Sequence, residues 1–132
     1  MNRTLMLAVL AAATLSVAHE ARAAGDAAAG EAVFKKNCMI CHRIGEGAKN
    51  LVGPELNGLD GRHSGSVAGY SYSPANKNSG VVWNEQTFKQ YIKDPKAMIQ
   101  GTKMIFPGLK EQKDIDDIWA YVSQFGPDGK KK

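Results

Sequence analysis

The chain has 132 residues but only two cysteines, Cys38 and Cys41, so at most one disulfide bond can form within it. Aromatic residues make up 8% of the sequence, and the formal net charge is only +4. Proteins that bind nucleic acid present a denser basic patch with interleaved stacking aromatics, so the sequence argues against this function. The longest hydrophobic run, residues 5–17, covers thirteen residues, whereas a membrane-spanning helix needs about twenty. Stable insertion into a membrane is therefore not expected.

This hydrophobic run is typical of an export signal. Arg3 gives a positive start before the run, and the small residues Ala21 and Ala23 follow it at the positions that a signal peptidase reads. We therefore expect residues 1–23 to be a secretory signal peptide and residues 24–132 to form a single domain, which their length allows. The exported chain is expected in a bacterial periplasm.

The exported part of the chain keeps a mild excess of positive charge. Loss of Arg3, Glu20 and Arg22 with the signal lowers the net charge from +4 to about +3. A mild excess of lysine suits docking onto the acidic surface of a partner protein.

Three segments show helical patterns: residues 25–38, 84–94 and 111–125. The first begins near Asp26 and contains Gly30, which costs about 1 kcal/mol relative to alanine inside a helix and so suggests close approach of another helix. The second begins at Asn84, a good N-cap, and ends before Pro95. Residues 96–100 add one further turn. The third carries an apolar stripe and ends at Gly126.

The remaining segments lack helical or strand periodicity. Residues 45–80 are rich in Gly, Ser, Asn and Pro and are expected to form a loop of about 36 residues, which compact domains seldom tolerate. Its apolar and aromatic residues argue against disorder, so a large apolar group that is not protein would explain how it packs. Residues 101–110 are a second loop, and residues 128–132 are expected to be a frayed tail. No strand is evident, so the predicted class is all-α with long loops.

The motif Cys38-Met39-Ile40-Cys41-His42 raises three alternatives for its chemistry. A thioredoxin-like redox pair lies in a βαβ unit, which is absent here. A zinc site needs four ligands, and adjacent Cys41 and His42 are awkward ligands for one tetrahedral ion. A plain disulfide would close a tiny loop, stabilise little and leave His42 unexplained. Covalent haem attachment explains all three residues, because the two thiols add to the vinyl groups and the histidine lies beneath the ring.

A haem iron held by His42 needs a ligand on its other face. His63 is one candidate, although it reads more simply as a loop residue. Met39 lies inside the attachment motif and cannot turn back, and Met98 lies on an expected helical turn, where methionine usually packs in the core. Met104 lies in a loop that is free of helical constraint, so it is the favoured ligand.

Several separated motifs now resemble one family: "GEAVFKKNCMICH", "GPELNGLDGR", "GYSYSPANKNSGVVW", "YIKDPKAMIQGTKMIFPG" and "DIWAYV". From about residue 25 to residue 125 the chain resembles the class I cytochromes c, close to the bacterial cytochromes c-two and to mitochondrial cytochrome c. The resemblance implies an all-α fold with few helices and long loops wrapped around one covalent haem c. It also implies that Cys38 and Cys41 hold the haem, that His42 and Met104 are its axial ligands, and that the Pro54 carbonyl accepts the His42 ring N–H.

The resemblance further assigns a set of polar residues to the haem surroundings. Tyr72 and Trp83 match residues that hydrogen-bond a haem propionate, Arg62 matches one close to it, and Thr102 matches a further propionate partner. Asn76 and Tyr91 match members of an internal polar network near the methionine. Gly30, Phe34 and Tyr121 match the crossing of the first and last helices.

These features predict electron transfer rather than catalysis. Histidine and methionine fill both axial positions, so the iron has no open site for a substrate, and the soft thioether raises the reduction potential. The partners implied by the resemblance are a cytochrome bc complex as reductant and a terminal oxidase or photosynthetic reaction centre as oxidant. We expect a monomer that docks on acidic surfaces through lysines near the haem edge: Lys35, Lys36, Lys96, Lys103 and Lys110. The alternatives are a five-coordinate haem gas sensor or peroxidase-like protein, and a thiol redox module that would be colourless.

Overall fold

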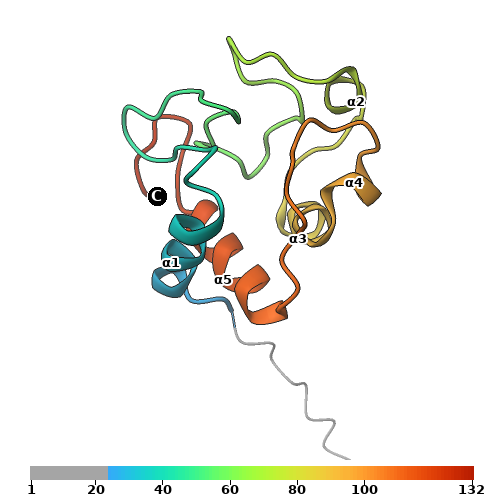
Figure 1. The fold of residues 1–132 in the computed structure, drawn as a ribbon. Coiled ribbons are helices and arrows are strands. Elements are labelled where there is room, and N and C mark those ends of the chain that lie inside the picture. The colour runs from blue at the N-terminus through green and yellow to red at the C-terminus, as the bar shows by residue number, and fades with distance from the viewer. Residues whose placement is uncertain (1–23) are drawn as a thin grey trace, which may run out of the picture.

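A computed structural model describes residues 24–132, so the expected signal peptide at residues 1–23 lies outside the described residues. The described part contains helices but no strand, and only two short antiparallel bridges join its loops. Figure 1 shows the elements in chain order: α1 (Ala27–Asn37), α2 (Pro74–Lys77), α3 (Glu85–Lys93), α4 (Pro95–Met98) and α5 (Gln112–Val122). The predicted all-α class is confirmed. No described helix combines the length and hydropathy that crossing a bilayer requires.

The helix boundaries follow from local chemistry. The Asp26 carboxylate accepts hydrogen bonds from the Ala28 and Ala29 N–H groups and so caps the start of α1. Asn84 and Thr87 form a reciprocal capping box at the start of α3. Helix α3 ends at Lys93, because Pro95 cannot continue it and instead begins α4.

Helices α1 and α5 cross at close range near one end of the molecule (Figure 1). At Gly30 a Cβ atom would lie 1.9 Å from the Asp117 carbonyl oxygen, so the two backbones approach more closely than any side chain would permit. Beside this point the Phe34 and Tyr121 rings pack with their centroids 5.5 Å apart. The predicted role of Gly30 in a helix crossing is therefore confirmed.

The Asp117 side chain adds a polar link to this crossing. Its Oδ1 accepts a hydrogen bond of 2.8 Å from the Asp26 N–H, and its Oδ2 is paired with Lys113 on the preceding turn of α5. Asp117 is only 3% exposed, and both of its carboxylate oxygens have partners. These partners compensate the cost of burying its charge. Ile115, Ile118 and Val122 of the same helix are fully buried and form the centre of the core.

The structure corrects the sequence prediction in two places. The loop at residues 45–80 is interrupted by the short helix α2, which Ser73 caps through its hydroxyl group. The tail at residues 128–132 was expected to be frayed, and this prediction is wrong. It folds back so that Lys131 bridges to Phe125 and the Lys132 N–H donates to the Gln124 carbonyl at 2.8 Å.

Packing against a distant loop holds this tail in place. Gly129 is buried, and a Cβ atom there would lie 2.4 Å from the Gly45 carbonyl oxygen. The Lys131 ammonium lies 5.7 Å from the centre of the Phe125 ring, at cation–π distance. The C-terminus is thus tied to the loop that follows the Cys38–His42 motif.

Candidate haem site

A cavity of about 330 Å³ lies between the turn after α1, the segment around α2, helix α3 and the loop before α5. Its floor is apolar and includes Phe34, Leu59, Phe88 and Ile118. All the residues that the sequence predicted to bind the cofactor or its iron line this cavity: Cys38, Cys41, His42, Pro54, Arg62, Tyr72, Asn76, Trp83, Tyr91, Thr102 and Met104. Segments up to 66 residues apart in the chain therefore meet at one site.

His42 enters the cavity from the tight turn that follows α1. The His42 N–H donates to the Cys38 carbonyl at 2.9 Å, and its ring Nδ1 lies 2.7 Å from the Pro54 carbonyl oxygen. Since a carbonyl can only accept, the proton resides on Nδ1 and the lone pair on Nε2 is left to bind a metal. Burial lowers the pKa of His42, whereas the hydrogen bond to Pro54 opposes this shift. The neutral form needed for ligation is favoured.

Gly53 allows the His42 ring to occupy this position. A Cβ atom on Gly53 would lie 2.4 Å from the ring Cε1, so any larger residue would displace the imidazole. The sequence analysis did not identify Gly53, since glycine beside a proline is also what an ordinary turn requires.

Cys38 and Cys41 reach the cavity from the same turn, and both carry free thiols. Burial, with a smaller contribution from Cys41, raises the pKa of Cys38 to about 12. The thiolate is the reactive form in redox exchange, so this environment disfavours a thiol redox module. Among residues 24–132 no group of three or more His, Cys, Asp or Glu side chains could hold a metal ion, so the zinc alternative gains no support. Covalent attachment to a haem would convert both thiols into thioethers, which do not ionise, so burial of these sulfur atoms would carry no electrostatic cost.

The four candidates for the second iron ligand are separated by their positions. Met104 lines the cavity, whereas His63, Met39 and Met98 are not among its lining residues. Met98 instead lines a shallow hollow beside α4, and Met39 is 42% exposed. A side chain of the same loop holds the backbone at Met104, because the Met104 N–H donates to Thr102 Oγ1 at 3.3 Å.

A short polar chain supports the methionine loop. The Tyr91 hydroxyl on α3 lies 3.0 Å from Thr102 Oγ1. Burial raises the pKa of Tyr91, although hydrogen bonds with Thr102 and Asn76 oppose this shift. The Trp83 ring packs edge-on against Tyr91, with centroids 5.0 Å apart. These contacts connect α3 to the loop at residues 101–110.

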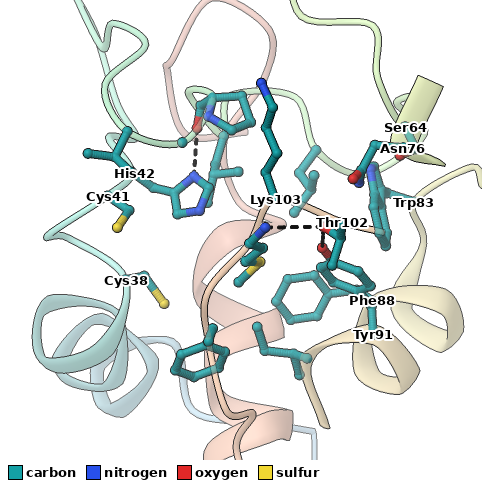
Figure 2. A pocket seen from close by; sticks show the side chains of 18 of the residues that line it. Cys38, Cys41, His42, Ser64, Asn76, Trp83, Phe88, Tyr91, Thr102 and Lys103 are labelled. Carbon is teal, nitrogen blue, oxygen red and sulfur yellow. Dashed lines mark hydrogen bonds between the residues drawn. The ribbon is translucent and has the colours of Figure 1, made fainter. Parts of the chain in front are cut away.

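Polar groups gather on the side of the cavity away from the two cysteines. Figure 2 shows Cys38, Cys41 and His42 on one side and Asn76 and Trp83 on the other.

Arg62 and Tyr72 add hydrogen-bond donors to the cavity lining. The guanidinium of Arg62 donates from Nη1 to the carbonyl oxygens of Glu55 and Asn57 at 3.0 and 3.1 Å, and burial lowers its pKa. Tyr72 accepts a hydrogen bond from the Val67 N–H through its hydroxyl oxygen, so the hydroxyl hydrogen is available to donate. The cavity thus offers donors suited to an anionic group.

The chemistry of this lining fits a haem. One side of the cavity offers two thiols and a metal-binding imidazole, the floor is apolar, and polar donors gather on the far side. Ser64 also belongs to the cavity lining, and its buried hydroxyl has no hydrogen-bond partner among the described residues.

Comparisons with known proteins decide the family. The cytochrome c family model matches residues 27–125. The chain belongs to the cytochrome c family. Cytochrome c-550 of Nitrobacter winogradskyi is 65% identical over 108 residues, which cover 82% of this chain and 98% of that protein. Cytochrome c2 of Rhodoplanes tepidamans is 63% identical over 107 residues, covering 81% and 99%. Cytochrome cH from Methylobacterium extorquens, a solved structure, has a TM-score of 0.69 and 45% identity, and the match covers 74% of this chain and 97% of that one.

Family membership gives the cofactor and the general activity. Cytochromes c bind haem c covalently through a Cys-x-x-Cys-His motif, which Cys38, Cys41 and His42 supply. The motif occurs once, so the chain takes one haem c. This protein is therefore an electron-transfer cytochrome with a class I fold, and members of this family carry electrons rather than catalyse substrate conversion.

The five lysines predicted to dock partners are all exposed, but they differ in their contacts. Lys35 pairs with Glu31 at 2.7 Å on α1, and Lys110 donates to the carbonyl oxygens of Lys93 and Pro107. Lys103 lines the cavity and donates to the Ser71 carbonyl at 2.7 Å. Lys36 and Lys96 are the other two exposed lysines of this group.

Proposed function

We propose that this protein carries single electrons in a bacterial periplasm from a cytochrome bc complex to a terminal oxidase or a photosynthetic reaction centre. His42 and Met104 are the proposed axial ligands. The observation that carries the proposal is that both residues line one cavity together with the two attachment cysteines, whereas the other candidate ligands do not. The haem supplies the one-electron couple of its iron.

The protein groups set the properties of this couple. Pro54 orients the His42 ring and increases its basicity through the hydrogen bond to Nδ1. Met104 offers a soft thioether, which favours the reduced iron and raises the reduction potential. With both axial positions held by side chains, no position remains for a substrate or a gas. This argues against the five-coordinate sensor or peroxidase-like alternative.

The mouth of the cavity presents a mainly apolar surface to a partner. Ile40, Val52 and Ile105 line the cavity and yet are 83%, 74% and 94% exposed. Such a rim suits close, water-excluding contact with a redox partner. Lys103, which lines the cavity, and the other exposed lysines predicted to dock partners would steer the protein onto acidic surfaces, with association that weakens as salt rises.

Export is the remaining part of this proposal. The pattern in residues 1–23 supports removal of a signal peptide, after which residues 24–132 would act as one monomeric domain in the periplasm. N-terminal sequencing of the protein purified from a periplasmic fraction should begin near Ala24. A start at Met1, or recovery only from the cytoplasm, would contradict this part.

The function is tested by mixing the reduced protein with membranes that contain a bc complex and a terminal oxidase, and with reaction-centre membranes, at low and high ionic strength. Rapid reoxidation that slows as salt rises is the expected result. Reoxidation no faster than without membranes would overturn the proposed partners. Ready binding of carbon monoxide to the reduced protein at neutral pH would instead support the five-coordinate alternative.

A further inference from the structure

Glu55 places a carboxylate beside a cationic side chain of the haem cavity. Its Oε1 lies 3.5 Å from Nη1 of Arg62, which lines the cavity. The Glu55 and Arg62 side chains are only 22% and 14% exposed, so water and salt screen this pair less than a surface pair. Among the ion pairs of the described residues, this is the one that includes a residue of the cavity lining.

Backbone contacts fix the positions of both side chains. Glu55 Oε2 accepts a hydrogen bond of 2.6 Å from the Asn57 N–H, and Arg62 Nη1 donates to the carbonyl oxygens of Glu55 and Asn57. The Glu55 N–H in turn donates to Asn50 Oδ1 at 3.0 Å. The carboxylate is therefore held next to the guanidinium instead of turning into solvent.

The charge of Glu55 acts on two residues of the cavity lining, although Glu55 is not itself a lining residue. Burial lowers the pKa of Arg62, whereas the charges of Tyr72 and Glu55 oppose this shift. Burial raises the pKa of Tyr72, and the charge of Glu55 adds to this shift while that of Arg62 opposes it. The electrostatic environment on this side of the cavity thus depends on Glu55.

A charge near the iron shifts the equilibrium between its two oxidation states. Reduction adds an electron to the haem, so a nearby positive charge stabilises the reduced state and a nearby negative charge stabilises the oxidised state. Arg62 raises the reduction potential in this way. We propose that Glu55 lowers the reduction potential of the haem by offsetting the charge of Arg62, an inference that rests on the covalent haem of the proposed function. A lower potential makes the reduced protein a stronger donor to its oxidant.

The test uses the haem-loaded protein and three variants. Glu55→Gln removes the charge but keeps the shape and an acceptor oxygen for the Asn57 N–H, and Glu55→Asp keeps the charge. Glu31→Gln is the matched control, because Glu31 pairs with Lys35 on α1 and does not line the cavity. The reduction potential is measured at neutral pH by equilibration with a redox couple of known potential.

The expected result is a higher potential in one variant only. Glu55→Gln should shift the equilibrium toward the reduced protein by a factor of about two or more, and a factor of two is about 18 mV for a one-electron couple. Glu55→Asp and Glu31→Gln should both stay close to the wild-type potential.

A Glu55→Gln protein with the wild-type potential, or a lower one, would overturn the inference. A shift in Glu55→Asp as large as that in Glu55→Gln would also overturn it, because altered packing and not the lost charge would then be the cause. An equal shift in Glu31→Gln would overturn it as well, since any carboxylate would then act alike. Where the variants keep covalent haem and the ferric sulfur-to-iron band, a failed prediction concerns Glu55 alone. A wild-type protein without covalent haem would instead remove the basis of the proposed function.

Discussion

Replacement of Gly30 by alanine tests whether the approach of α1 and α5 holds the fold together. The new Cβ would lie 1.9 Å from the Asp117 carbonyl oxygen and 2.5 Å from its carbon, and backbone atoms cannot rotate away as a side chain can. The helices must therefore separate, which weakens the Phe34–Tyr121 packing and the hydrogen bond from Asp26 to Asp117.

The expected size of this effect is set by two opposing contributions. Overpacking of this kind costs about 3 kcal/mol. Alanine is better than glycine inside a helix by about 1 kcal/mol, which offsets part of the cost. The Gly30→Ala protein should thus lose about 2 kcal/mol of its free energy of unfolding, which lowers the melting temperature by about 8 °C for a domain of this size.

Denaturant unfolding of the haem-loaded protein measures this loss, with Ala32→Gly on the exposed face of α1 as the matched control. Helix propensity alone predicts that Gly30→Ala stabilises the protein and that Ala32→Gly destabilises it by about 1 kcal/mol. The structure predicts that Gly30→Ala is the more damaging of the two. A Gly30→Ala protein as stable as the wild type would refute the close backbone contact.

Three further changes test other parts of the structure. Gly53→Ala should push the His42 ring out of place and raise the high-spin fraction in the ferric visible spectrum, whereas a spectrum like the wild type would contradict the contact. Burial opposes the charge of Asp117, but hydrogen bonds from Lys113 and the Asp26 N–H hold its pKa below the ordinary value. This stabilisation is present above the unfolded pKa of about 4 and is lost as pH falls through the folded pKa. The denaturant midpoint of unfolding should therefore fall less steeply at acid pH in Asp117→Asn than in the wild type. Deletion of residues 128–132 should cost about 1–2 kcal/mol in the same assay, whereas a frayed tail would cost nothing.

The motifs that carry the chemistry could be read from the sequence because each is local. The spacing of Cys38, Cys41 and His42 is a property of five consecutive residues, and the helix caps at Asp26 and Asn84 depend on neighbours within one turn. The apolar residues of the long loop show no helical or strand periodicity, so the sequence could indicate that this loop packs against a large group that is not protein. These features set the architecture of the site.

The features that the sequence did not predict depend on contacts between distant segments. The tail is ordered because Gly129 packs on Gly45, a contact across 84 residues that no local pattern encodes. The role of Gly53 depends on the placement of the His42 ring, and the unpaired hydroxyl of Ser64 is evident only once the chain is folded. Helix α2 was missed because a helix of four residues is too short to show periodicity.

The most direct test of the account is the Met104→Ala protein, compared with Met98→Ala as its control. Both should keep covalent haem, because Cys38 and Cys41 are unchanged. Met104→Ala should lose the sulfur-to-iron charge-transfer band of the ferric spectrum, and its reduction potential should fall by on the order of 0.1 V or more, within the range of roughly 0.8 V that axial ligands set. Met98→Ala should keep both. A Met104→Ala protein with the band and the potential of the wild type would contradict the proposed ligation and the electron-transfer mechanism built on it.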